Sequence, residues 1–199
     1  MCMQCQKSPV YEFTNKKKLC KRCFIKYFQK KFFYIIRKFK MIEKGDIVGY
    51  FKSDNFRDVV LADVLKIFSE KTMIPLAKLR GSKDFTQIRD FSSKEKIRKI
   101  ALSSTIDVVA DGIIHIIIKN NSSKLKEYLP IQKQKKKMVI SPLYLFLDSE
   151  VLLYARLKKL KFKEKKDKKD NISRFIDGLE KMHPEVKRAI VNSYLELYS

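Results

Sequence analysis

The sequence predicts an α/β protein in which a small cysteine-containing module precedes a long amphipathic helix and a domain with a parallel sheet. Four cysteines form two closely spaced pairs within residues 1–23. Apolar residues then recur at three- and four-residue steps over 24–39, which is typical of an amphipathic helix. A short apolar run at 47–51 reads as a buried strand and is followed by a turn and a second helical period. We therefore expect a module at 1–23, a connecting helix at 24–42 and an α/β domain at 43–199.

The cysteines have the spacing C-x2-C-x14-C-x2-C, formed by Cys2, Cys5, Cys20 and Cys23. Each CxxC places two thiolates on one tight turn, and two such turns complete a tetrahedron around a metal ion. Because all four positions are thiolates, no position remains for water, and the spacing predicts one structural zinc ion in a zinc ribbon. Redox or packing cysteine pairs and an iron centre of the rubredoxin kind are the alternatives.

The charge balance favours a polyanionic partner. The formal net charge is +23, from 45 Lys and Arg against 22 Asp and Glu, and such a charge favours nucleic acid through counterion release. A lysine-rich composition without such a partner is the alternative. The basic face of the connecting helix would continue the cations of the module, so we expect RNA contact there. The predicted RNA-binding residues are Lys16, Lys17, Lys18, Lys21, Arg22, Lys26, Lys30, Lys31, Arg37 and Lys38.

The sequence contains no run near the roughly 20 apolar residues that a membrane-spanning helix needs. Its most apolar stretch is the short run at 113–118. The first residues form a Cys pair and not the basic and apolar regions of a secretory signal. We therefore expect a soluble, cytoplasmic protein whose cysteines stay reduced.

The α/β domain is expected to begin with the strand at 47–51, a polar turn at 52–57 and a helix over 59–68, and to carry helices on both faces of its sheet. Farther along, we expect an irregular segment at 72–92, a helix at 93–103, a strand at 105–110 and an ambiguous element at 112–120. The last part is expected to hold a basic loop at 133–137, an amphipathic helix at 148–160, a solvated linker at 161–171 and helices at 172–182 and 185–198.

Isolated titratable residues are expected to be structural. His115 lies among isoleucines with no nucleophile or acid that the sequence places beside it, and His183 precedes Pro184 at a helix start. Aspartates near turns usually cap helices, and we assign no chemistry to Asp54, Asp58, Asp107 and Asp111.

Beyond these patterns, the N-terminal quarter resembles the tRNA 2-thiouridine synthetases of archaea and the eukaryotic cytosol. In that family a zinc ribbon is followed by an amphipathic helix and a "kMI-x-x-GD-x-V" turn into the first strand. Residues 142–162 and 175–197 are similar to later segments of the family. The matching positions are Met41, Ile42, Gly45, Asp46 and Val48, then Pro142, Leu143, Glu150, Tyr154, Ala155 and Phe162, then Leu179, Glu180, Pro184 and Lys187. The resemblance implies a reduced PP-loop domain, which is adenine nucleotide alpha-hydrolase-like.

The chain departs from this family where active members hold ATP. Their SGGKDS loop lets backbone amides approach the phosphates, but the corresponding segment at 52–58 has no glycine and places Phe56 within the loop. The degenerate loop is assigned to Ser53, Asp54, Asn55, Arg57 and Asp58. A second family motif, GHN-x-DD, is expected after the strand at 105–110, and residues 110–115 lack its acidic pair. The catalytic or cluster-binding cysteines of active members also have no counterpart once the four zinc ligands are assigned.

These losses favour a degenerate member without catalytic residues. The segment 27–32 also resembles the zinc-proximal helix of the family's non-catalytic partner subunit. The resemblance thus implies a tRNA-binding subunit of a cytosolic wobble-uridine 2-thiolation complex, in a heterodimer with an active thiolase paralogue. An active ATP-dependent synthetase with a rebuilt nucleotide site and a stand-alone zinc-ribbon RNA-binding protein are the alternatives.

Overall fold

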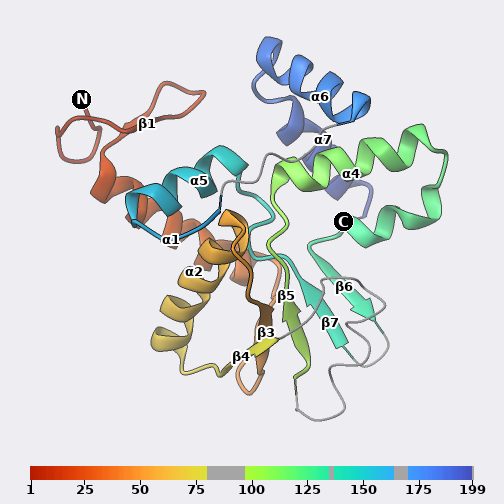
Figure 1. The fold of residues 1–199 in the computed structure, drawn as a ribbon, viewed down its shortest axis with the longest axis horizontal. Coiled ribbons are helices and arrows are strands. Elements are labelled where there is room, and N and C mark those ends of the chain that lie inside the picture. Colours follow the sequence, from red (N-terminus) through yellow and green to blue (C-terminus); the bar gives the residue numbers. More distant parts are fainter. Residues whose placement is uncertain (80–96, 135–136, 164–169, 199) are drawn as a thin grey trace.

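A five-stranded sheet forms the centre of the larger domain in this computed structural model, which describes residues 1–79, 97–134, 137–163 and 170–198 (Figure 1). The strand order is β4-β3-β5-β7-β6. β4, β3, β5 and β7 are parallel, and β6 pairs with β7 antiparallel. The predicted parallel α/β sheet is confirmed, with one antiparallel edge strand added. The strands are β3 (Val48–Phe51), β4 (Leu76–Leu79), β5 (Lys99–Ala101), β6 (Ile131–Gln134) and β7 (Lys137–Ile140).

One face of this sheet packs against three helices, α1 (Lys21–Lys38), α2 (Phe56–Thr72) and α5 (Asp148–Leu157). Because successive side chains in a strand point to opposite faces, Val48 and Tyr50 join this core while Phe51 joins a second one. The expected strand at 47–51 and the polar turn after it are confirmed. The helical cover expected of the sheet is confirmed for this face.

Helix α1 connects the cysteine module to the sheet domain. Phe24, Phe28 and Phe32 are completely buried along one face of its 18 residues, as the helical period predicts. The Phe28 ring lies with its centroid 4.2 Å from those of Phe146 and Tyr154, on the α5 side of the core. Aromatic packing therefore fixes α1 against the domain.

A second group of helices lies beside the sheet domain. It consists of α4 (Ile106–Ile118), the short 3-10 helix η1 (Ser122–Tyr128), α6 (Asn171–Met182) and α7 (Val186–Glu196). Their shared core includes Val109, Ile113 and Val191, packed around Tyr144. Gly112 permits the close approach of η1, because a Cβ there would overlap the ring of Tyr128.

Several expected elements in the middle of the chain are wrong. The segment 105–110 is the start of helix α4, because Ile106, Val109 and Ile113 recur at helical spacing and bury one face. The strand in this region is β5, inside the segment expected to be helical, and β4 lies in the segment expected to be irregular. Lys133 and Lys137 belong to the paired strands β6 and β7. Residues 80–96, 135–136 and 164–169 of these expected segments lie outside the described residues.

The C-terminal elements follow the sequence closely. Helix α5 and the two final helices α6 and α7 begin and end within three residues of their expected bounds. Across the described part of the chain, no helix combines the length and apolarity needed to span a membrane.

Candidate functional site

The four cysteine sulfurs converge in the N-terminal module, beside a hairpin of β1 (Tyr11–Glu12) and β2 (Lys18–Leu19). All four Sγ atoms lie within 4.8 Å of one another. Cys5 Sγ is 3.3 Å from Cys20 Sγ and 3.7 Å from the Sγ atoms of Cys2 and Cys23. Metal–sulfur bonds of about 2.3 Å in a tetrahedron separate the sulfurs by about 3.8 Å. The donor set therefore fits one metal ion.

Backbone hydrogen bonds position the two CxxC turns. Cys2 N–H donates to Lys7 O at 2.9 Å, and Gln6 N–H donates to Cys2 O at 3.0 Å, which closes the first turn. The second turn is the start of α1, where Cys20 is the N-cap and Cys23 lies in the first helical turn. Three of the four cysteines are buried, and Cys5 is exposed.

The electrostatics of the module suit a cation among the thiolates. Burial would raise the pKa of the Cys2 thiol, but backbone hydrogen bonds from Cys20 and Gln4 lower it to about 6. A backbone hydrogen bond from Cys23 likewise lowers the pKa of Cys20. Burial and the neighbouring sulfurs raise the pKa of Cys23 to about 12, because thiolates collected in one place repel each other. A bound metal ion removes this repulsion and favours all four thiolates.

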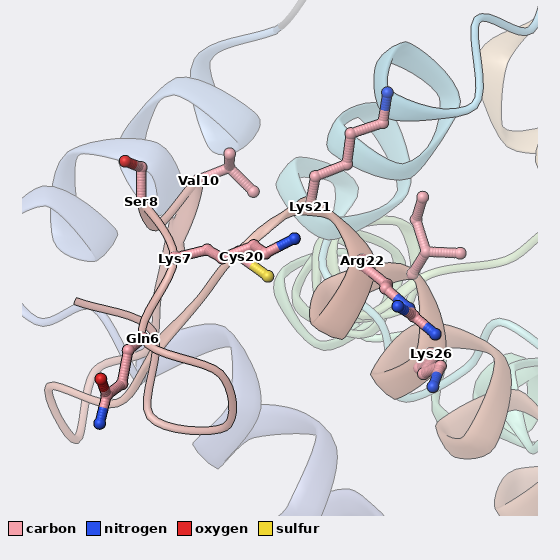
Figure 2. A pocket seen from close by; sticks show the side chains of 9 residues that line it. Gln6, Lys7, Ser8, Val10, Cys20, Lys21, Arg22 and Lys26 are labelled. Carbon is pink, nitrogen blue, oxygen red and sulfur yellow. The ribbon is translucent and has the colours of Figure 1, made fainter.

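A groove beside the metal centre collects part of the predicted RNA-binding set. Lys21, Arg22 and Lys26 line a groove of about 920 Å³ between the loop at 6–10 and the first turns of α1 (Figure 2). Lys7 lies on its other side. Sequence reasoning missed Lys7, because a single lysine in a loop belongs to no periodic pattern.

The remaining predicted cations are dispersed. Lys16 and Lys17 are exposed on the hairpin, and Lys18 forms an ion pair with Glu12. Lys30 is exposed in the middle of α1, while Arg37 and Lys38 are exposed in its last turn. Since an α-helix rises about 1.5 Å per residue, that turn lies roughly 20 Å from the groove.

Lys31 points inward, unlike its neighbour Lys30. Its Nζ lies 3.0 and 3.1 Å from the carboxylate oxygens of Glu150, whose side chain is fully buried. Tyr27 Oη also donates to Glu150, at 3.4 Å, and Arg188 lies 3.6 Å from it. Desolvation lowers the pKa of Lys31 despite this acidic partner. Lys31 thus connects α1 to α5 and is largely withdrawn from solvent.

The loop at 52–58 is filled by its own hydrogen bonds. Asn55 caps α2, accepting from Arg57 N–H at 2.9 Å, and Asn55 N–H donates to Ser53 Oγ at 3.1 Å. The hydroxyls of Ser53 and Ser103 both donate to Asp58, the latter at 2.6 Å. Asp58 is only 3% exposed. Both serines are therefore used to satisfy a buried carboxylate. Asp54, at the exposed edge of the loop, pairs with Lys163 at 2.8 Å.

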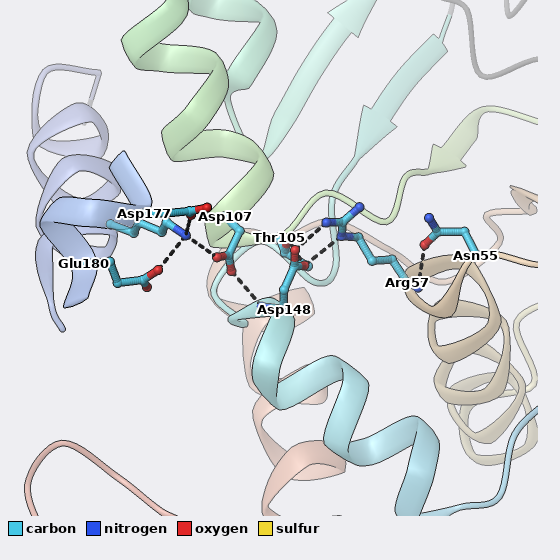
Figure 3. Close-up of polar contacts among 8 residues, drawn as sticks. Asn55, Arg57, Thr105, Asp107, Asp148, Asp177 and Glu180 are labelled. Carbon is cyan, nitrogen blue, oxygen red and sulfur yellow. Dashed lines mark hydrogen bonds and ion pairs between the residues drawn. The ribbon is translucent and has the colours of Figure 1, made fainter. Parts of the chain in front are cut away.

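Arg57 extends from this loop to the start of α5. Its Nε donates to Asp148 Oδ1 at 2.7 Å, and its terminal nitrogen pairs with the other carboxylate oxygen (Figure 3). Thr105 Oγ1 donates to Asp148 at 2.8 Å. The ion pair lies near the carboxyl ends of β3 and β5. The strand order reverses between these two strands, and α/β folds usually bind ligands at such a switch point. The cavity at the switch point has a volume of only about 190 Å³, below the roughly 300 Å³ at which ligand pockets begin. It is lined by Asn55, Arg57, Leu102, Ser103, Ser104 and Val108.

The second motif of the family is expected directly after a strand, and the strand here is β5, which ends at Ala101. The placement of that motif at 110–115 is therefore wrong, because residues 110–115 lie inside α4 and the segment that follows β5 is 102–107. One acidic residue, Asp107, remains in 102–107. Its Oδ2 accepts from Asp148 N–H at 2.7 Å and its Oδ1 from Lys187 Nζ at 2.8 Å. Lys187 also pairs with Asp177 at 3.1 Å and Glu180 at 2.6 Å, and these carboxylates raise its pKa although burial alone would lower it. Asp107 thus links the switch-point edge to α6 and α7 (Figure 3).

His115 occupies a structural position, as expected. Its Nε2 lies 2.6 Å from Asp170 Oδ2, and its Nδ1 lies 2.8 Å from the carbonyl oxygen of Asp111. Asp170 is also the N-cap of α6, accepting from Ser173 N–H at 2.9 Å. The hydrogen bond to Asp170 raises the pKa of His115. His183 is exposed at the C-cap of α6.

Comparison with known proteins gives a match in structure alone. No family model and no curated protein matches the sequence. Among solved structures, the chain is similar to the U34-tRNA thiolase NcsA from Methanococcus maripaludis, which was solved with its four-iron, four-sulfur cluster. The TM-score is 0.76 at 20% sequence identity, over 98% of this chain and 86% of the thiolase. The chain therefore has the fold of a tRNA thiolase.

Proposed function

We propose that the protein is a non-catalytic, tRNA-binding subunit of a cytosolic tRNA wobble-uridine 2-thiolation complex. The observation that carries this proposal is a thiolase fold kept over 98% of the chain, with a switch point that is closed by the pairing of Arg57 with Asp148. An active paralogue would supply the ATP and sulfur chemistry. This subunit would bind tRNA electrostatically and hold it against that partner.

A single zinc ion is the metal that we propose for the cysteine module. Cys5 Sγ lies 3.3 to 3.7 Å from the other three sulfurs and all four lie within 4.8 Å of one another, which suits one tetrahedral ion. A four-iron cluster places each thiolate on a different iron and needs a wider spread of sulfurs. Zinc bound in this way would be structural, since four thiolates leave no open position. Cys2, Cys5, Cys20 and Cys23 would then hold the ribbon against the start of α1.

The loop at 52–58 lacks the glycines of a phosphate-binding loop, and we therefore propose no catalytic residue in it. Phosphate-binding loops need glycines so that backbone amides can approach the ligand. Here Phe56 packs toward Phe162, with ring centroids 6.4 Å apart, and Lys163 N–H donates to Asp54 O at 2.8 Å. The segment after α5 thus covers one side of the loop, and Ser53 is directed to Asp58.

Affinity purification from native cells tests the proposed partner. The tagged protein would be purified with and without RNase treatment, and co-purifying proteins would be identified and quantified by mass spectrometry. We expect a stoichiometric homologue that carries an intact SGGKDS loop and stays bound after RNase. The Arg57→Met variant, altered at the switch point and checked by circular dichroism to be folded, should capture the same partner. If no such homologue co-purifies, the subunit proposal is refuted and a stand-alone RNA-binding protein becomes the better account.

An active synthetase with a rebuilt nucleotide site is the second candidate. The polar lining of the switch-point cavity by Asn55, Ser103 and Ser104 favours it. Titration calorimetry with magnesium-ATP distinguishes the two. Stoichiometric ATP binding that is lost in Ser53→Ala or Asp54→Ala would support the enzyme, and no heat of binding would support the subunit.

A further inference from the structure

The groove beside the metal centre concentrates unpaired positive charge. Lys7, Lys21, Arg22 and Lys26 all line it, and none of them forms an ion pair with a carboxylate in the described part of the chain. Exposed cations elsewhere, for example Lys16, Lys30 and Arg37, are dispersed over the hairpin and α1. The groove brings four exposed cations together in one place.

The metal centre accounts for only part of this charge. Four thiolates around one divalent ion leave two negative charges, which two of the four cations would balance. The positive end of the α1 dipole adds to the excess. Basic residues are unfavourable in a first helical turn, yet α1 begins with Lys21 and Arg22 and has no acidic residue there. An anionic ligand in the groove would offset that cost.

The lining of the groove also contains apolar and hydrogen-bonding groups. Val10, which is 43% exposed, and the half-buried Ile25 offer a surface for a planar base, while Gln6 and Ser8 can accept or donate hydrogen bonds. Figure 2 shows the Lys7 side chain extending from the loop toward the start of α1. A flexible strand can enter such a groove with its phosphates near the cations, whereas an A-form duplex keeps its bases stacked inside.

We propose that this groove binds a single-stranded segment of RNA, a loop or an end of tRNA, with its phosphates on Lys7, Lys21, Arg22 and Lys26. The proposal rests on the proposed tRNA-binding function and names the part of the RNA that is held. None of the described residues that line the groove is aromatic, so bases would contact Val10 and Ile25 without aromatic stacking, a contact that a duplex cannot make. Most of the binding free energy is therefore carried by phosphate contacts, depends strongly on salt and discriminates weakly between sequences.

Fluorescence anisotropy over a range of salt concentrations tests this assignment. The probes are a labelled single-stranded oligonucleotide, a blunt RNA duplex with the same number of phosphates, and a whole tRNA transcript. The groove variant is Lys21→Gln with Lys26→Gln. The matched control, Lys40→Gln with Lys119→Gln, removes the same charge from exposed positions that neither line the groove nor belong to the predicted RNA-binding set. Metal content and circular dichroism verify that each variant is folded.

We expect the wild-type protein to bind the single strand more tightly than the duplex. The negative slope of log affinity against log salt should become shallower by about 1.4 for the single strand in the groove variant, since each of the two lost phosphate contacts contributes about −0.7. The control variant should leave that slope unchanged. Equal effects of the two variants, tighter duplex binding, or equal competition by poly-glutamate would overturn the groove assignment. If tRNA binds and the paralogue co-purifies despite such a result, the proposed function stands and the groove assignment alone fails.

Discussion

Arg57 of helix α2 and Asp148 of helix α5 meet in an ion pair at the carboxyl edge of the sheet, with Arg57 Nε 2.7 Å from Asp148 Oδ1. Asp148 also accepts from Thr105 and donates its backbone N–H to Asp107. The pair therefore joins three helices where related folds bind ligands. An internal ion pair thus holds this edge of the sheet together.

Removing Arg57 should destabilise the fold without creating a nucleotide site. The Arg57 and Asp148 side chains are 17% and 24% exposed, so the pair lies between the surface and buried classes. We expect Arg57→Met to lower the free energy of unfolding by about 2 kcal/mol. Urea denaturation measures this. The control Lys66→Met disrupts an exposed pair with Glu70 and should change stability by less than about 0.5 kcal/mol. An Arg57→Met variant as stable as the wild type would refute the structural role of the pair.

Two neighbouring lysines of α1 should differ strongly in how much their loss lowers the free energy of unfolding. Lys31→Met leaves the fully buried Glu150 without its closest cation and should cost about 3 kcal/mol of stability. Lys30→Met, at an exposed position, should cost less than about 0.5 kcal/mol. Thermal and urea unfolding of the two variants make the comparison. Equal stability of both would show that Lys31 is an ordinary surface lysine.

The contact between His115 and Asp170 should stabilise the fold in a pH-dependent way. The hydrogen bond to Asp170 raises the pKa of His115 in the folded state. The stabilisation is therefore complete below the unfolded pKa of about 6.5 and is lost as the pH rises through the folded pKa. We expect His115→Gln to lower the urea midpoint at acidic pH and to match the wild type at alkaline pH. A difference that is constant with pH would contradict protonation of His115 in the folded state.

The metal should be necessary for the N-terminal module. We expect one zinc ion per chain by elemental analysis and no visible absorption from iron. Cys20→Ser should abolish binding and lower the melting temperature, because a structural zinc ion contributes folding free energy directly. The exposed Met3→Ser, which lies between two ligands without being one, is the matched control. A four-iron cluster in the purified protein would refute the proposed metal.

The sequence predicts the parts of the fold that rest on strong local patterns. The cysteine spacing indicated the convergence of four sulfurs, and the regular placement of Phe24, Phe28 and Phe32 indicated α1 and its buried face. The buried strand at 47–51 was also evident, since a continuous apolar run between polar turns is typical of a parallel sheet.

Other elements depend on tertiary contacts that the sequence does not display. The β-branched run at 105–110 favours a strand by propensity, but packing of Val109 and Ile113 against Tyr144 makes it helical. Strand β5 has three residues and contains Lys99, whose burial requires Asp46 from a distant loop. The pairing of Lys31 with Glu150 joins residues 119 positions apart, so no local pattern distinguishes Lys31 from Lys30.

The level of 2-thiouridine in total tRNA, measured by mass spectrometry after depletion of this protein from its native cells, tests the central proposal most directly. We expect 2-thiouridine to fall to background, and to be restored both by the wild-type chain and by an Asn55→Ser variant, which alters the switch-point loop while keeping a helix cap. Unchanged 2-thiouridine after complete depletion would contradict a role of this protein in tRNA thiolation.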